Sequence, residues 1–141
     1  MTSPRLLEPF TLRGATARNR VWLAPMCQYR ATDGLPNDWH LVHLGARAHG
    51  GFGLIVAEAT AVVPHGRITP QDVGLWDDAQ VAAWERVLAP VHDAGALAAV
   101  QLAHAGRKAS TYRPWAAERG SVPVAEGGWP NGPEGKEGLI D

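Results

Sequence analysis

Three continuous apolar runs alternate with two amphipathic segments, and this alternation constrains the fold more than any other feature. The runs cover residues 21–24, 53–63 and 97–102. Because they lack the polar alternation of a half-exposed strand, they are typical of strands buried on both faces of a parallel sheet. The sequence therefore predicts an α/β protein with β-α-β-α-β order and right-handed crossovers.

Capping residues bound the two predicted helices. The first spans 38–49, with Asn37 or Asp38 as its N-cap and Gly50-Gly51 as a left-handed ending. The second spans 77–94 and ends at Gly95, with an interruption at Pro90 because proline removes a helical hydrogen bond.

Apolar residues at helical spacing predict a stripe on each helix that packs on the sheet. On the first helix the stripe comprises Trp39, Val42 and Ala46, with Leu41, Leu44 and Ala48 alongside; on the second it comprises Val81, Trp84, Leu88 and Val91.

Three strands and two helices cannot cover their own sheet edges. A closed (β/α)₈ TIM barrel usually requires about 250 residues. The chain of 141 residues is therefore expected to supply the first three β/α units of such a barrel. The alternative is a small open α/β sheet, but the first βα turn lacks the G-x-G-x-x-G phosphate cradle.

The two ends of the chain are expected to lie outside the central sheet. Residues 6–12 predict a weak N-terminal capping strand, since Pro9 suits an edge better than a central position. Residues 118–141 shift to Gly, Pro and Glu and predict a flexible loop or linker after the barrel portion, 1–117.

Composition excludes several classes of partner. A net charge of -1 provides no attraction to nucleic acid or to an anionic membrane. One cysteine cannot close an intrachain disulfide, which favours a reducing compartment. Since no leader-like or membrane-spanning apolar run is evident, a cytoplasmic protein is expected.

Chemically versatile side chains follow each apolar run. Ala24-Pro25-Met26-Cys27-Gln28-Tyr29 follows the first run, Ala57-Glu58-Ala59-Thr60 lies late in the second, and Gln101 to Lys108 closes the third. Because the carboxyl ends of parallel strands meet at one mouth of a barrel, these groups are expected to form a single site.

The residues alone leave simpler interpretations open. Cys27 could be a buried structural thiol, and Tyr29 an ordinary core or surface aromatic. Ordinary packing at the strand ends would account for the small and apolar residues, and Gln101 could be a polar side chain satisfied inside the barrel.

Two groups of basic or imidazole side chains also suggest binding. His104, Arg107 and Lys108 are consistent with an anion site or with anchoring of a loop. His40 and His43 are three apart on a helix, but no third ligand at suitable spacing is evident, so no metal site is expected.

Six stretches together resemble the Old Yellow Enzyme family of FMN-dependent ene-reductases, in particular its thermophilic-like branch. They occur in the family's order and spacing. The stretches are Asn19-Arg20, Ala24 to Tyr29, Asp38 to Gly45, Glu58 to Val62, Gly66 to Thr69 and Gln101 to Lys108.

The resemblance implies a TIM barrel that holds FMN at its carboxyl-terminal mouth. Such an enzyme uses NAD(P)H to reduce the activated C=C bond of an α,β-unsaturated carbonyl or nitro compound.

The resemblance also implies roles for individual residues. Cys27 would lie at the N5/O4 edge of the flavin and tune its potential, and Tyr29 would lie on the substrate side. The remaining cofactor-binding residues implied are Ala24, Pro25, Met26, Ala59 and Gln101.

The family's substrate-anchoring His pair, proton-donating tyrosine and FMN phosphate site belong to later strands. The resemblance therefore implies a partner: a second polypeptide or a C-terminal segment that completes the barrel, with a homo-oligomer expected for the complete protein. The alternatives are a catalytically incomplete fragment that serves as an assembly module, and a related FMN barrel reductase with another substrate class.

Overall fold

The computed structural model describes residues 4–130, and the predicted segment 131–141 lies outside the described residues. Three strands form a parallel sheet in the order β3-β4-β5. The remaining two strands form an antiparallel hairpin, β1-β2. The elements are β1 (Phe10–Leu12), β2 (Ala15–Ala17), β3 (Trp22–Leu23), α1 (Asp38–His49), β4 (Leu54–Ala61), α2 (Asp78–Asp93) and β5 (Leu97–Ala103), with short 3₁₀ turns at Arg5–Leu7, Pro64–Gly66, Gly106–Lys108 and Val124–Glu126.

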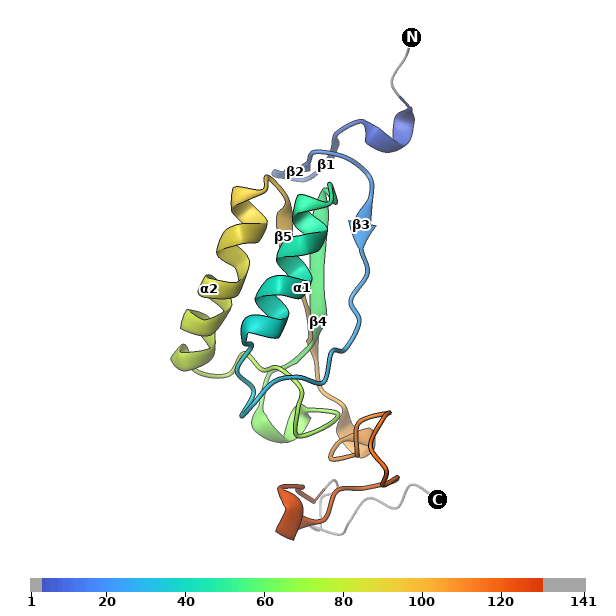
Figure 1. Cartoon of the computed structure of the whole chain (residues 1–141), viewed down its shortest axis with the longest axis vertical. Coiled ribbons are helices and arrows are strands. Elements are labelled where there is room, and N and C mark those ends of the chain that lie inside the picture. The colour runs from blue at the N-terminus through green and yellow to red at the C-terminus, as the bar shows by residue number, and fades with distance from the viewer. Residues whose placement is uncertain (1–3, 131–141) are drawn as a thin grey trace.

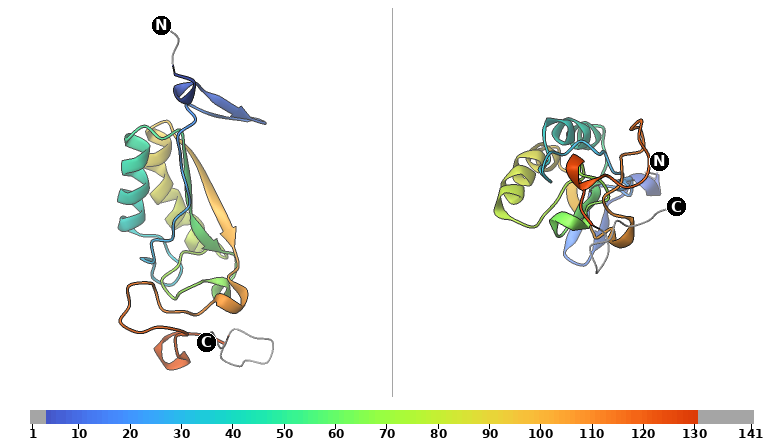
Figure 2. Two further views of the ribbon diagram at one scale, coloured as in Figure 1. Left: turned by 90° about the vertical axis from the view of Figure 1, so that its right-hand side faces the viewer. Right: turned by 90° about the horizontal axis from the view of Figure 1, so that it is seen from below.

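Both helices cover the same face of the parallel sheet (Figures 1 and 2). In a doubly wound open sheet the crossover helices lie on both faces, whereas in a barrel every helix lies outside. The strands also follow one another in sequence order across the sheet. The wall of a barrel has this arrangement, and the predicted β-α-β-α-β order is confirmed.

The helix boundaries follow from their caps. The Asn37 side chain accepts the Trp39 N–H at 3.1 Å, and the predicted span 38–49 matches α1. Asp77 caps α2 through the N–H groups of Ala79 and Gln80. The predicted interruption at Pro90 is wrong, since α2 continues to Asp93.

The core lies between the sheet and the helices. It includes the fully buried Ile55, Val87 and Val91, together with Leu44 and Trp84. The stripe predicted for α1 is wrong at its centre, because Trp39 is 48% and Val42 64% exposed. The buried face of α1 carries Leu44 and Ala48, which were predicted alongside the stripe, together with His40 and Gly45.

An apolar cavity of about 530 Å³ lies between α2 and β5. Val81 and Leu88 of the predicted second stripe line it, as do Ala98 and Val100. Val81 is accordingly 44% exposed. Because another β/α unit would pack on this side of β5 in a complete barrel, the cavity marks the place where the wall continues.

The N-terminal segment differs in detail from the predicted single strand over 6–12. Arg5–Leu7 is a 3₁₀ turn, and only Phe10–Leu12 is extended, after Pro9. This short strand pairs with Ala15–Ala17 around the turn at Arg13-Gly14. The hairpin lies at the amino ends of the parallel strands (Figure 1), where it leaves the opposite end free.

Candidate functional site

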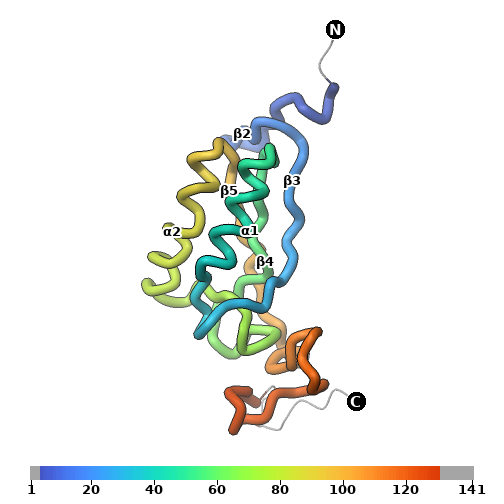
Figure 3. The backbone as a smooth tube through the Cα atoms, viewed as in Figure 1, coloured from blue at the N-terminus to red at the C-terminus, as the bar shows by residue number. Residues whose placement is uncertain are grey.

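The loops that follow the three parallel strands gather at one end of the molecule (Figure 3). The loop after β3 leads to α1, the loop after β4 leads to α2, and the segment after β5 continues to residue 130. Backbone hydrogen bonds tie them together: Ala31 donates to the Gln71 carbonyl at 2.9 Å, and Thr111 to the Ile68 carbonyl at 2.8 Å. The predicted site residues follow these strands or lie near their carboxyl ends.

The structure places Cys27, Ala59 and Gln101 at the same level of the sheet. Ala59 is paired with Gln101 in the β4–β5 register. The Ala59 N–H lies near enough to the Cys27 sulfur to lower the pKa of the thiol. The thiol and the amide therefore flank one alanine, whose small side chain would allow a flat ring to approach the backbone.

Tyr29 is directed toward Cys27. Its side chain lies near enough to the Cys27 sulfur for each group to shift the pKa of the other, and its ring packs edge-on against Trp115, with centroids 5.4 Å apart. Its φ of 52° is unusual for a residue other than glycine, so the surrounding contacts must hold this conformation. Burial, together with the neighbouring Cys27 and Asp72, raises the pKa of Tyr29 to about 12, so the phenol stays protonated at neutral pH.

The environment of Cys27 favours a neutral thiol. Burial raises its pKa above the ordinary value, and the Asp72 carboxylate raises it further, while the Ala59 N–H opposes both. A thiol with a raised pKa is a poor nucleophile but can donate a weak hydrogen bond. These properties suit a residue that contacts a cofactor without forming a covalent bond.

Most of the predicted cofactor residues are open to solvent. Ala24 and Gln101 are exposed, Met26 is 56% exposed, and Pro25 is half-buried. A small, apolar and amide-bearing surface of this kind fits the face and the hydrogen-bonding edge of an isoalloxazine ring. The residues present therefore fit FMN.

His104, Arg107 and Lys108 are exposed at the turn after β5. The His104 ring accepts the Gly106 N–H at 3.0 Å and lies edge-on to His65, with centroids 5.5 Å apart. These contacts stabilise the turn, which agrees with the predicted loop-anchoring role. No acid in the described residues forms an ion pair with either cation.

Within residues 4–130 no group of three or more His, Cys, Asp or Glu side chains is placed to hold a metal ion. Over the same range no helix is both long and apolar enough to cross a bilayer.

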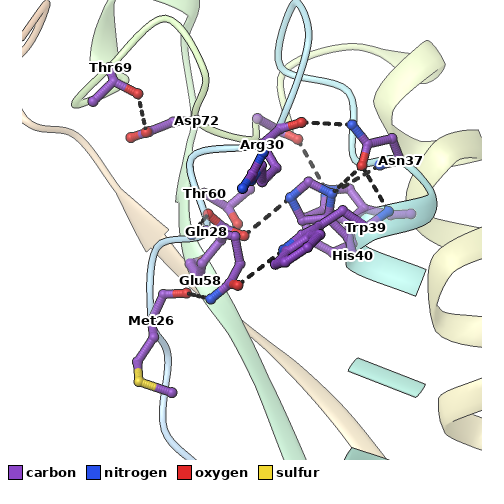
Figure 4. A network of polar contacts seen from close by, with 12 residues as sticks. Met26, Gln28, Arg30, Asn37, Trp39, His40, Glu58, Thr60, Thr69 and Asp72 are labelled. Carbon is purple, nitrogen blue, oxygen red and sulfur yellow. Dashed lines mark hydrogen bonds and ion pairs between the residues drawn. The ribbon is translucent and has the colours of Figure 1, made fainter. Parts of the chain in front are cut away.

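Two buried carboxylates near the site were given no role in the analysis of the sequence. Glu58 lies 3.3 Å from His40 and accepts the Gln28 N–H at 2.8 Å (Figure 4). Asp72 accepts the Thr69 hydroxyl and the Ile68 N–H, both at 2.8 Å. One signal was available for Glu58, because a charged residue within a continuously apolar strand requires a buried partner. Asp72 lies in a loop rich in turn residues, where an aspartate is unremarkable.

Asp72 should make stability depend on pH. Burial raises its pKa from 3.8 to about 6, against the opposing effect of its hydrogen bonds. A carboxyl whose folded pKa is raised binds its proton more tightly in the folded state, so its contribution to stability is lost as the pH rises from about 4 to about 6. Urea unfolding should show that Asp72→Asn gains stability relative to wild type over this range, on the order of 3 kcal/mol. An identical difference between the two proteins at pH 4 and pH 7 would contradict this assignment.

Comparison with known proteins agrees with this geometry. A family model described as the NADH:flavin oxidoreductase / NADH oxidase family matches residues 5–133. An NADH:flavin oxidoreductase of Gibberella zeae is 49% identical over 129 residues, which is 92% of this chain and 31% of the relative.

Solved structures show the same fold. A morphinone reductase in complex with tetrahydroNAD superposes with a TM-score of 0.70 at 37% identity, covering 77% of this chain and 29% of its own. The old yellow enzyme homologue of Zymomonas mobilis superposes at 0.69 with 40% identity, covering 75% and 30%. The chain thus spans about a third of the length of these relatives.

Proposed function

Since this chain belongs to the NADH:flavin oxidoreductase / NADH oxidase family, which includes the Old Yellow Enzymes, we propose that it forms the first part of an FMN-dependent ene-reductase. The predicted fold, an N-terminal portion of a TIM barrel, is confirmed. FMN and a nicotinamide nucleotide, the cofactors expected from the sequence, are those of the family. The proposed substrate is an activated alkene, an α,β-unsaturated carbonyl or nitro compound.

One observation carries the proposal: Cys27, Ala59 and Gln101 lie together at the carboxyl end of the sheet. When bound there, FMN would accept hydride from NAD(P)H and deliver it to the alkene. The Gln101 amide offers both a donor and an acceptor to the polar edge of the ring. Ala24, Pro25 and Met26 supply its apolar contact, and the single-cysteine motif favours an ene-reductase over a related FMN barrel of another substrate class.

Tyr29 is proposed to line the substrate side of the site. Its protonated phenol can donate a hydrogen bond or pack against the substrate. Trp115 holds the Tyr29 ring from the loop after β5 and thereby limits where a substrate can lie. The proton donor, the substrate-anchoring His pair and the phosphate site are assigned to strands beyond residue 141, and the complete protein is expected to be a homo-oligomer.

The test uses the complete protein, including the remaining strands. Purified protein should show the visible spectrum of bound flavin and should consume NADPH when cyclohexenone is added. Protein that remains colourless after addition of FMN, with all its strands present, would contradict the proposal. Flavin binding without turnover on any activated alkene would retain the family and reject the substrate class.

Cys27→Ala should shift the flavin reduction potential while FMN remains bound. A weak S–H hydrogen bond contributes about 0.5–1 kcal/mol, which corresponds to roughly 10–20 mV for a two-electron couple. Spectral titration against a reference dye would measure the shift. Loss of FMN from this variant would show that Cys27 is a structural anchor instead.

A further inference from the structure

Glu58 and His40 form a buried pair behind the proposed site. Their side chains are 3% and 1% exposed, and Glu58 Oε1 lies 3.3 Å from His40 Nε2. Neither residue belongs to the open surface of Ala24, Met26 and Gln101. Burying such a pair rarely stabilises a protein relative to an apolar pair, so its presence calls for another explanation.

The contacts of His40 fix its tautomer. The Asn37 backbone N–H donates to Nδ1 at 3.0 Å, and the direction of that N–H is fixed by its peptide plane. The Asn37 side-chain oxygen also lies 3.1 Å from Nδ1. A proton on Nδ1 would nevertheless point toward the Asn37 backbone N–H, and two donors would then face each other. Nδ1 is therefore an acceptor, and Nε2 carries the proton that faces Glu58. The Nε2 proton forms no hydrogen bond of regular geometry within the described residues, so the two side chains are in polar contact at 3.3 Å without a regular hydrogen bond.

Glu58 links this imidazole to the segment that carries the thiol. Its Oε2 accepts the Gln28 N–H at 2.8 Å, one residue after Cys27. Glu58 is also the extra residue at the register shift between Ala57 and Ala59 in β4. Such a bulge redirects side chains. Here the Glu58 carboxylate contacts α1, while the next N–H, that of Ala59, contacts the Cys27 sulfur.

The first turn of α1 holds the same segment at two further points (Figure 4). The Trp39 indole donates to the Gln28 side chain at 3.1 Å, and the Asn37 amide donates to the Arg30 carbonyl at 2.7 Å. The Arg30 guanidinium lies 4.8 Å from the centroid of the Trp39 ring. Residues 28–30 are therefore bound at several points to the start of α1, and Glu58 with His40 is the buried centre of this connection.

We propose that Glu58 and His40 are positioning residues that hold the Cys27 thiol against Ala59 and so set its contact with the flavin. The inference rests on the proposed function for the role of the thiol, but the position of the thiol can be measured independently. The Glu58 carboxylate is suited to this role because Oε2 accepts the Gln28 N–H while Oε1 lies 3.3 Å from the Nε2 that carries the proton.

Glu58→Gln should break this arrangement although it preserves shape. An amide has one acceptor oxygen and one donor group. If its oxygen accepts the Gln28 N–H, its NH₂ group faces the Nε2 proton, and Asn37 prevents the other tautomer. His40→Asn removes the Nε2 donor, whereas His40→Gln places an amide NH₂ near the Nε2 position and should preserve the contact with Glu58.

The first experiment measures alkylation of Cys27 by iodoacetamide in the complete protein freed of flavin, with the modified peptide quantified by mass spectrometry. Glu58→Gln and His40→Asn should each change the rate by about fivefold or more, while His40→Gln should stay within about twofold of wild type. Circular dichroism checks that each variant is folded. If Glu58→Gln does not fold, the two His40 variants decide the question. Equal rates in wild type and His40→Asn, or in His40→Gln and His40→Asn, would overturn the proposal.

The second experiment measures the flavin reduction potential in a double-mutant cycle. If Glu58 acts through the thiol, Glu58→Gln should shift the potential less in the Cys27→Ala background than in the wild-type background. Arg86→Ala is the control, because it breaks an exposed ion pair between α2 and α1, Arg86 with Asp38 at 2.8 Å, and its effect should be the same in both backgrounds. An equal effect of Glu58→Gln in both backgrounds would overturn the proposal. If Cys27→Ala alone leaves the potential unchanged, the proposed function of the thiol fails and the alkylation result alone decides where the pair acts.

Discussion

Residues 1–141 produced alone should bind FMN at least about 10³-fold more weakly than the complete protein. In TIM barrels the phosphate site usually lies after strands seven and eight. The structure contains only the first three strands of the parallel sheet within its described residues. Three missing charge-assisted hydrogen bonds to the phosphate, at about 1.5–3 kcal/mol each, are enough for this loss.

Flavin fluorescence during titration with FMN would measure both affinities. Riboflavin, which lacks the phosphate, is a useful control, because the complete protein should discriminate between the two ligands and residues 1–141 should not. FMN binding of equal strength by the isolated chain would show that the flavin site is complete without the later strands.

His40→Leu should be the most destabilising single substitution near the site. It removes the partner of a carboxylate whose side chain is 3% exposed and leaves that charge buried. Breaking one side of a buried pair typically costs about 3–5 kcal/mol. Urea unfolding of the complete protein, followed by circular dichroism, would measure the change in the free energy of unfolding.

The control for this prediction is the double variant His40→Leu with Glu58→Leu. Replacing both partners by apolar side chains removes the buried charge, so the double variant should be more stable than His40→Leu alone. A double variant that is no more stable than the single would show that the carboxylate is not the source of the loss.

The sequence was informative about α1, α2 and the order of the strands, because caps and continuous apolar runs are local signals. Asn37, one of the two cap candidates for the first helix, caps α1, and Asp77, the first residue of the predicted second helix, caps α2. The buried face of α1 could not be predicted from hydrophobicity, since it carries His40 and Gly45 while Val42 is exposed. A Cβ atom added to Gly45 would lie 3.8 Å from the ring of Pro90 in α2, an ordinary contact distance, so Gly45 faces the other helix through tertiary packing.

For the site, too, features set by local sequence could be predicted, whereas contacts between distant segments could not. The convergence of Cys27, Ala59 and Gln101 followed from parallel strands ending at one edge. The contact between Glu58 and His40 could not be derived, because it depends on a bulge in β4 and on the way α1 packs. The positive φ of Tyr29 likewise could not be predicted, because tyrosine has no preference for that conformation.

A structure of the complete protein with FMN bound tests the central claim most directly. The account predicts that the Cys27 sulfur and the Gln101 amide both lie within about 4 Å of the same isoalloxazine ring, with Ala59 between them. A flavin bound elsewhere, or one that contacts only one of these two side chains, would contradict it.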